Sequence, residues 1–126
     1  MRRWKQRGAL AALASFAAGC LGVADVSRGE AHALVAAGAL LLDVRSPAEF
    51  AERHPTEAVN IPLDQLPSRL RELGPRGRPI VVYCHTGMRA IVATRRLRAA
   101  GFAATRNLGP MGRWYAERVG PPATFE

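Results

Sequence analysis

A cysteine and an arginine are the residues of this chain best placed to carry chemistry. Cys84 ends the apolar run 79–83, and Arg89 follows after four intervening residues, which makes the pattern Cys-x4-Arg. A short loop between a strand and a helix aims backbone N–H groups inward, and the helix points the positive end of its dipole at the same spot. A cysteine placed there should ionise readily to the nucleophilic thiolate, and the donor fork of Arg89 suits oxyanions. The alternative is a cysteine that is simply buried at a strand end.

The rest of the chain predicts an α/β domain around this loop. Short apolar runs predict strands over residues 39–44, 58–61 and 80–83, and another within 102–108. Capping residues, helical spacing and terminal glycines predict helices after Ser27 and after Ser46, and over residues 63–73, 88–100 and 113–118, with a turn at 109–112. This alternation is typical of a mainly parallel sheet flanked by helices on both faces.

Two strand ends are expected to share one site. In open α/β sheets, active sites lie outside the carboxyl ends of the strands. Asp43 lies near the end of the first predicted strand and Cys84 follows the third. We therefore expect Asp43 and Cys84 to lie at the same edge of the sheet.

The N-terminus predicts a targeting segment ahead of a single domain. Residues 1–7 carry four basic side chains, and residues 8–24 form an uncharged run of 17 residues. This pattern is typical of a signal peptide over residues 1–24, which leaves residues 25–126 as the domain. Cleavage before Asp25 predicts an exported, periplasmic protein. Two alternatives remain: a lipoprotein, because residues 17–20 resemble a lipobox ending in Cys20, and an uncleaved membrane anchor, because 17 residues is the short limit for a span.

Charge and cysteine usage narrow the classes of function. The formal charge is +8, and removal of the signal would leave 14 arginines and 10 acidic residues, or +4. No basic face interleaved with aromatic residues is evident, so we expect no nucleic-acid partner. Without Cys20, or with it lipidated, Cys84 has no partner, and a lone cysteine in an oxidising compartment is a liability unless it is buried or used. His32 and His54 lack ligand spacing, so no metal is expected.

Four stretches of the chain resemble the sequence signatures of one protein family, and they occur in the same order as in that family. They are residues 41–50, His54 with residues 58–63, residues 81–90, and residues 108–111 with Trp114. Together they resemble the single-domain rhodaneses, a family of sulfurtransferases, over residues 25–122. The chain departs from the family at Thr56-Glu57, where a Pro-Gly pair is usual, and at Gly109-Pro110, where Gly-Gly is frequent. We expect altered loop geometry at both places rather than lost chemistry, with Thr56-Glu57 bearing on the site entrance.

The resemblance implies a thiosulfate sulfurtransferase that needs no cofactor. The Cys84 thiolate would take the outer sulfur of a donor such as thiosulfate as a persulfide, and an acceptor (cyanide or a thiol) would collect it. Backbone N–H groups of the loop residues would stabilise the anionic sulfur. Those residues are His85, Thr86, Gly87, Met88 and Arg89.

Several side chains have two possible roles each. Arg89 would orient the donor or hold the loop, and Arg45 would bind the donor or form a structural ion pair. Asp43 would support the site through neighbouring loops or cap the turn that starts at Arg45. Met88 and Thr86 would line the pocket, while His85 would contact substrate or lie on the rim.

Two other functions remain open. Cysteine phosphatases and arsenate reductases with a related loop use Cys-x5-Arg, and the shorter loop here favours sulfur over the wider phosphate. A non-catalytic binding module or sulfur carrier is the other alternative, although Cys84 and Arg89 are both present. The partners expected are a small-molecule donor and acceptor, with a possible membrane tether through the N-terminus, for a monomer or homodimer.

Overall fold

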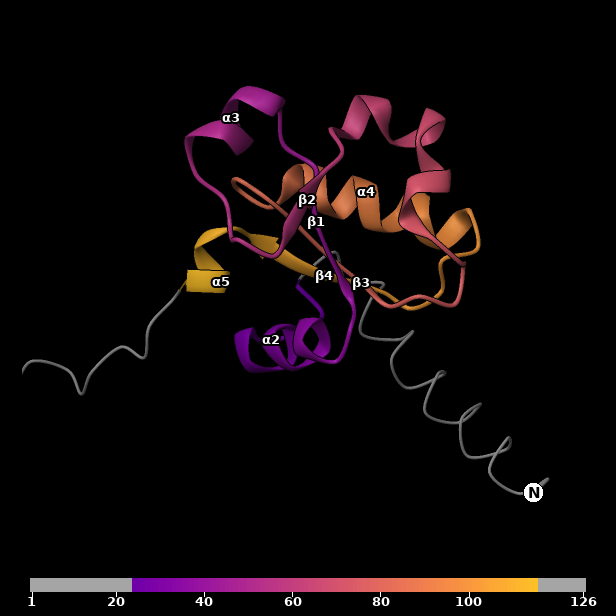
Figure 1. Cartoon of the computed structure of the whole chain (residues 1–126), viewed down its shortest axis with the longest axis horizontal. Helices are drawn as coiled ribbons and strands as arrows, with labels where there is room; N and C mark the ends of the chain where they lie inside the picture. Colours follow the sequence, from indigo (N-terminus) through magenta and orange to yellow (C-terminus); the bar gives the residue numbers. More distant parts are fainter. Residues whose placement is uncertain (1–23, 116–126) are drawn as a thin grey trace, which may run out of the picture.

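Four parallel strands form the sheet, in the order β2–β1–β3–β4 (Figure 1). The computed structural model describes residues 24–115. The strands are β1 (Leu40–Asp43), β2 (Ala58–Asn60), β3 (Ile80–Cys84) and β4 (Thr105–Pro110). The central strands β1 and β3 are buried along their whole length, as strands covered on both faces should be. The predicted α/β class with a parallel sheet is confirmed.

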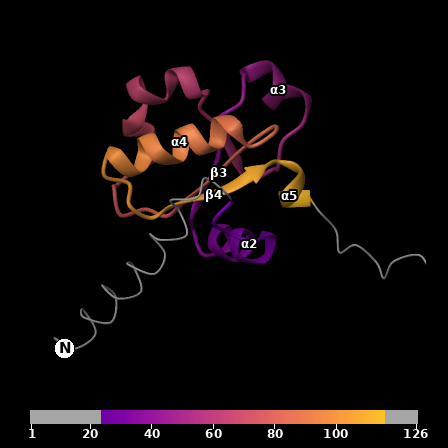
Figure 2. The ribbon, with the colours of Figure 1, turned by 180° about the vertical axis from the view of Figure 1, so that it is seen from behind.

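Helices cover both faces of this sheet (Figures 1 and 2). α2 (Arg28–Ala36) and the short α5 (Gly112–Tyr115) lie on one face, and α3 (Pro47–Glu52) and α4 (Met88–Ala99) lie on the other. Successive side chains of a strand point to opposite faces. Leu42 and Val82 therefore pack on the α4 side, and the same alternation places Cys84 on that side and Tyr83 on the α2 side.

Local signals fix where the helices begin. Ser27 accepts a hydrogen bond from the Glu30 N–H at 3.1 Å, and Ser46 accepts one from the Glu49 N–H at 3.2 Å. Both serines sit in complete capping boxes, in which the glutamate side chain also accepts from the cap N–H. The predicted starts of α2 and α3 are confirmed.

Residues 63–73 differ from the predicted α-helix. They form two 3₁₀ segments, η1 (Leu63–Ser68) and η2 (Leu70–Leu73), with Pro67 inside the first. Proline has no N–H and clashes with the preceding turn of an α-helix. The hydrogen bonds therefore span three residues, as from the Arg69 N–H to the Leu66 carbonyl at 3.1 Å. Leu66 and Leu73 are still buried, so the spacing predicted burial correctly and helix type wrongly.

The predicted turn at 109–112 is also wrong in part. β4 continues through Gly109 and Pro110, and its pairing with β3 is irregular, because Val82 aligns with Asn107 and Tyr83 with Gly109. Gly109 has a φ of 89°, a conformation that favours glycine and accommodates the extra residue of a bulge. Pro110 is tolerated because β4 lies at the edge of the sheet.

The predicted signal segment, apart from Ala24, lies outside the described residues, as do the last residues of the predicted helix 113–118. Within residues 24–115, every helix is too short or too polar to cross a membrane.

A buried ion pair joins the carboxyl ends of the central strands. The Asp43 carboxylate accepts hydrogen bonds from the Arg45 backbone N–H at 2.8 Å, from Arg45 Nη2 at 2.7 Å and from the Tyr83 hydroxyl at 2.5 Å. Asp43 is 0% exposed and Arg45 is 3% exposed. Burial raises the pKa of Tyr83, and its hydrogen bond to Asp43 raises that pKa further, so the hydroxyl remains a donor.

The same cluster extends to the neighbouring strand. Arg45 Nη2 also donates to the Arg53 carbonyl at 2.7 Å, and Asn60 Nδ2 donates to the carbonyls of Asp43 and Arg45 at 3.1 and 3.0 Å. The polar cluster therefore fixes β1, β2 and β3 relative to one another at the edge where Cys84 lies.

We expect Asp43→Ala to lower the free energy of unfolding by about 3–5 kcal/mol, because it leaves a buried guanidinium without its counter-ion. Tyr83→Phe should cost about 1.5–3 kcal/mol, the usual contribution of a hydrogen bond to a charged group. Urea unfolding followed by circular dichroism measures both. Arg69→Ala, which breaks the exposed pair with Glu72, is the control and should leave the midpoint near that of the wild type. A midpoint for Asp43→Ala equal to the control's would contradict this account.

Candidate active site

The Cys84 thiol lies at the carboxyl end of β3 and faces the first turn of α4. Cys84 is 0% exposed, and the Gly87 N–H donates a hydrogen bond to its Sγ at 2.9 Å. Gly87 has a φ of 109°, which turns the chain back over the sulfur before α4 begins at Met88. The four residues between Cys84 and Arg89 thus close a tight loop around one sulfur atom.

The start of α4 is arranged to receive negative charge. No side chain caps the N-terminus of this helix of 12 residues. The Ile91 N–H, in the first turn of the helix, donates a hydrogen bond to the Gly87 carbonyl at 3.1 Å. The first N–H groups of a helix have no intrahelical acceptor, and they carry the positive end of its dipole. An anionic sulfur at Cys84 would lie at this helix end, as the sequence predicts.

The outer residues of the loop form its rim. His85, Thr86 and Met88 are exposed, and Met88 has 70% of its surface accessible. For His85 this is the predicted rim position.

The end of β4 supports the loop from beneath. The Met111 N–H donates to the Cys84 carbonyl at 2.7 Å. A Cβ built on Gly87 would lie 3.6 Å from Pro110 Cδ, so the proline ring packs directly against the loop glycine. The departure from the family pattern at Pro110 therefore changes how the loop is supported.

Arg89 is paired with a residue of α3. Its Nη1 and Nη2 donate to the two carboxylate oxygens of Glu49 at 2.7 and 2.9 Å. The two side chains are 37% and 32% exposed. The hydrogen bonds from Arg89 lower the pKa of Glu49 to about 2, so the carboxylate is ionised and the pair intact in mild acid as well as at neutral pH. This geometry ties the first turn of α4 to α3.

Asp43 and Arg45 lie at the same edge of the sheet as Cys84 but do not contact the sulfur. The Arg45 guanidinium is buried against Asp43, which favours the structural ion pair over the predicted role in binding a donor. Asp43 caps the turn at Arg45, and its hydrogen bond with the Tyr83 hydroxyl links it to the residue that precedes Cys84. Within residues 24–115, no cluster of His, Cys, Asp or Glu side chains is placed to hold a metal ion.

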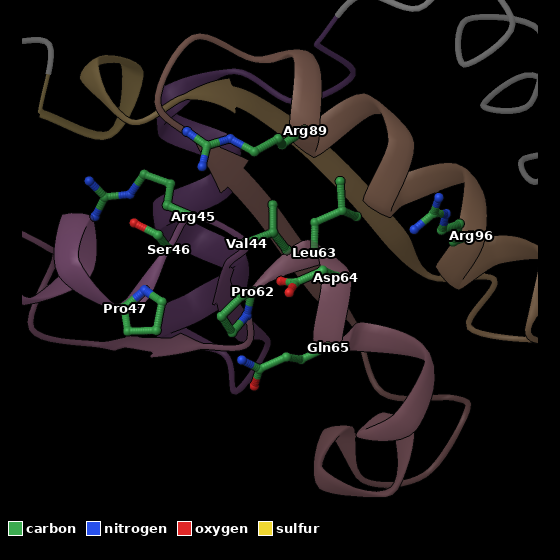
Figure 3. A pocket seen from close by; sticks show the side chains of 10 residues that line it. All are labelled: Val44, Arg45, Ser46, Pro47, Pro62, Leu63, Asp64, Gln65, Arg89 and Arg96. Atoms are coloured by element: carbon green, nitrogen blue, oxygen red, sulfur yellow. The ribbon is translucent and has the colours of Figure 1, made fainter.

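A cavity of about 530 Å³ opens beside the loop, between α3, η1 and α4 (Figure 3). Arg89 belongs to both the loop and the cavity wall. Cys84 does not line it, and neither do Thr86 and Met88, for which a lining role was expected, nor Thr56-Glu57. The lining residues are Val44, Arg45, Ser46, Pro47, Pro62, Leu63, Asp64, Gln65, Arg89 and Arg96.

Two residues of this region are not singled out by sequence reasoning as parts of the site. Tyr83 falls in a predicted buried strand, where a hydroxyl must find a partner, but the sequence does not identify that partner as Asp43. Glu49 lies at the capping position three residues after Ser46, and nothing in its spacing indicates that it also binds Arg89.

Comparison with known proteins gives a consistent result. The Rhodanese-like domain model matches residues 27–117. A sulfurtransferase of Allochromatium vinosum is 36% identical over 69 residues, which cover 55% of this chain and 64% of that protein. Thiosulfate sulfurtransferase 16 of Arabidopsis thaliana is 34% identical over 95 residues, covering 67% of this chain and 79% of that protein.

A solved structure of a human single-domain sulfurtransferase, TSTD1, matches with a TM-score of 0.66 at 32% identity, over 71% of this chain and 93% of that one. Other relatives are longer, and the chain spans 49% of rhodanese-like domain-containing protein 15 of Arabidopsis thaliana. Since the domain model covers most of the chain and the fold agrees, this protein belongs to the rhodanese-like domain family.

Proposed function

We propose that this protein moves a sulfane sulfur from a donor such as thiosulfate to a thiophilic acceptor through a persulfide on Cys84. The observation that carries the proposal is the position of Cys84 Sγ, which accepts the Gly87 N–H at the uncapped start of α4. Membership of a family with sulfurtransferase relatives supports sulfur transfer in general. The donor, the acceptor and the roles of the residues are our inference from the geometry.

The first half-reaction follows from the charges involved. The Cys84 thiolate attacks the outer sulfur of thiosulfate, the new S–S bond forms, and the bond to the sulfite group breaks. Sulfite leaves with the electron pair, and the negative charge moves to the outer sulfur of the persulfide. Loop N–H groups and the α4 dipole stabilise that charge, as an oxyanion hole does. In the second half-reaction an acceptor attacks this sulfur and Cys84 returns as thiolate.

A cysteine phosphatase is less compatible with the loop. The Gly87 N–H already lies at hydrogen-bond distance from Sγ, and the four intervening residues leave a cradle around a single sulfur atom. A phosphoryl group needs room for three further oxygens. Hydrolysis of an aryl phosphate without any sulfur uptake would favour the phosphatase instead.

Intact-mass analysis after treatment with thiosulfate tests the persulfide directly. The wild type should gain one sulfur atom that dithiothreitol removes, and Cys84→Ser should gain none, because the nucleophile is lost. Cys20→Ser is the matched control and should gain sulfur like the wild type. If none of the three proteins takes up sulfur, thiosulfate is not the donor and the proposal fails for it.

The pair between Arg89 and Glu49 indicates that Arg89 holds the loop more than it binds the donor. Arg89→Ala and Glu49→Gln should then each lower kcat/KM for thiosulfate by a similar factor of about two to five, the range for loss of a partly exposed ion pair. The double variant should be no worse than either single one, because both remove the same interaction. A much larger loss for Arg89→Ala, confined to KM, would instead place the guanidinium on the donor.

We also propose export, with residues 1–24 as the signal. The Asp25 N–H donates to the Asn107 carbonyl at 2.9 Å, and a free amino group at Asp25 would keep that hydrogen bond. The domain can therefore accept a new N-terminus there.

Expression in a bacterial host should yield a soluble periplasmic protein whose mass begins at Asp25. An acylated N-terminal Cys20 in the membrane fraction would favour the lipoprotein instead. An intact N-terminus in that fraction would favour the membrane anchor.

A further inference from the structure

The end of β4 contacts both ends of the Cys84 loop. The Met111 N–H donates to the Cys84 carbonyl at 2.7 Å, which fixes the residue at the start of the loop. The Pro110 ring packs against Gly87, since a Cβ built on Gly87 would lie 3.6 Å from Pro110 Cδ. Gly87 is the residue whose N–H donates to Sγ at 2.9 Å. Two consecutive residues therefore constrain the loop on either side of the sulfur.

A bulge in β4 brings these two residues to the loop. Val82 pairs with Asn107. A regular ladder would continue from this pair and place Gly109 opposite Cys84. The observed partner of Cys84 is instead Pro110, because β4 carries one extra residue after Asn107. The position of the proline ring thus depends on the bulge.

The Asn107 side chain stabilises the bulge. Its Oδ1 accepts a hydrogen bond from the Gly109 N–H, two residues further on, at 2.8 Å, which is the bonding of an Asx turn. Asn107 is 5% exposed, so this hydrogen bond is shielded from water. On the outer side, its backbone N–H and carbonyl bond to Asp25 at 2.6 and 2.9 Å. Asn107 is therefore fixed in place, and its amide fixes the residue that precedes Pro110.

We propose that Asn107 and Pro110 are positioning residues for the proposed sulfur transfer, on which this role rests: they keep the Gly87 N–H on the sulfur and so favour the Cys84 thiolate over the thiol. A hydrogen bond to an anion is stronger than one to a neutral group, so a donor that is fixed in place stabilises the thiolate more than the thiol. A relaxed loop would lose part of this difference. Both residues act through Gly87 rather than on the sulfur itself.

The charged and titratable side chains at this edge of the sheet stay unchanged in the variants that test this role. Arg89 is among them, and its guanidinium also interacts with the Cys84 thiolate. A shift in the titration of the thiol therefore reports the backbone of the loop. The unchanged side chains are Asp43, Arg45, Glu49, Tyr83, His85 and Arg89.

The ultraviolet absorbance of the thiolate, followed against pH in the Cys20→Ser background, tests this role without any sulfur donor, and Cys84→Ser supplies the baseline. Asn107→Ala removes the acceptor of the Gly109 N–H, and Pro110→Ala removes the ring atom nearest Gly87. Each should raise the midpoint of the titration by about one pH unit, as expected from loss of one hydrogen bond to a charged group. Asn107→Ser should stay nearer the wild type, because its hydroxyl can accept the same N–H.

Sulfur transfer should follow the titration. Below the wild-type midpoint, Asn107→Ala and Pro110→Ala should lower kcat/KM for thiosulfate about tenfold, the fraction of thiolate lost for a shift of one pH unit. The loss should disappear at high pH, where the thiol of every variant is ionised, whereas a variant that had only lost its fold would not recover. Pro75→Ala is the matched control, because Pro75 is an exposed proline in the connector before β3.

Midpoints equal to that of Pro75→Ala in both test variants would overturn the positioning role, and so would an activity loss that persists at high pH. Sulfur uptake by the wild type is measured separately by intact mass. Absence of uptake would overturn the proposed function together with this role in it, whereas normal uptake with unshifted midpoints would overturn only the positioning role.

Discussion

The electrostatic fit between the Cys84 sulfur and the start of α4 is the constraint on which the site depends. An N-terminal capping side chain typically contributes about 1 kcal/mol to a helix, and α4 has none. The Gly87 N–H instead points at Sγ, so the cysteine sulfur lies where a capping side chain would otherwise be. Burial of Ala90, Ala93 and Leu97 holds the helix against the sheet without that contribution. Packing on one side of α4 thus leaves its N-terminal N–H groups free to interact with the sulfur rather than with a capping side chain.

The alternation of side chains along β3 places Tyr83 and Cys84, which are neighbours in the chain, on opposite faces of the sheet. Tyr83 points to the α2 face, where its hydroxyl joins the ion pair of Asp43 and Arg45. Cys84, the next residue, points to the α4 face. The Asp43 carboxylate neutralises the buried Arg45 guanidinium locally, so this pair adds little net charge to the edge of the sheet where the sulfur lies. The charge that acts on the sulfur therefore comes from backbone N–H groups, the helix dipole and the nearby Arg89 guanidinium.

The features that sequence predicts correctly depend on local interactions. The capping serines, the strand–loop–helix unit at Cys84 and the alternation of strands with helices are all set by neighbours in the chain. The features that it misses join distant residues: Glu49 and Arg89 are 40 positions apart, as are Asp43 and Tyr83. Helical spacing over residues 63–73 identifies the buried leucines, but it does not separate an α-helix from the 3₁₀ turns that Pro67 imposes. The role of Arg45 depends on burial, which only the folded chain defines.

The departure at Pro110 shows how the family pattern can change while the loop is kept. β4 is an edge strand, and unpaired N–H and C=O groups at an edge invite pairing with another chain. Asp25 covers part of this edge, because its backbone N–H and its carboxylate both bond to the Asn107 backbone, at 2.9 and 2.6 Å. Pro110 has no N–H to offer at the end of β4 that lies nearest the Cys84 loop, and its ring packs against Gly87. A proline at this position therefore removes one unpaired N–H from the edge and places its ring against the loop glycine. For that reason the loss of the usual glycine is compatible with an intact cysteine loop.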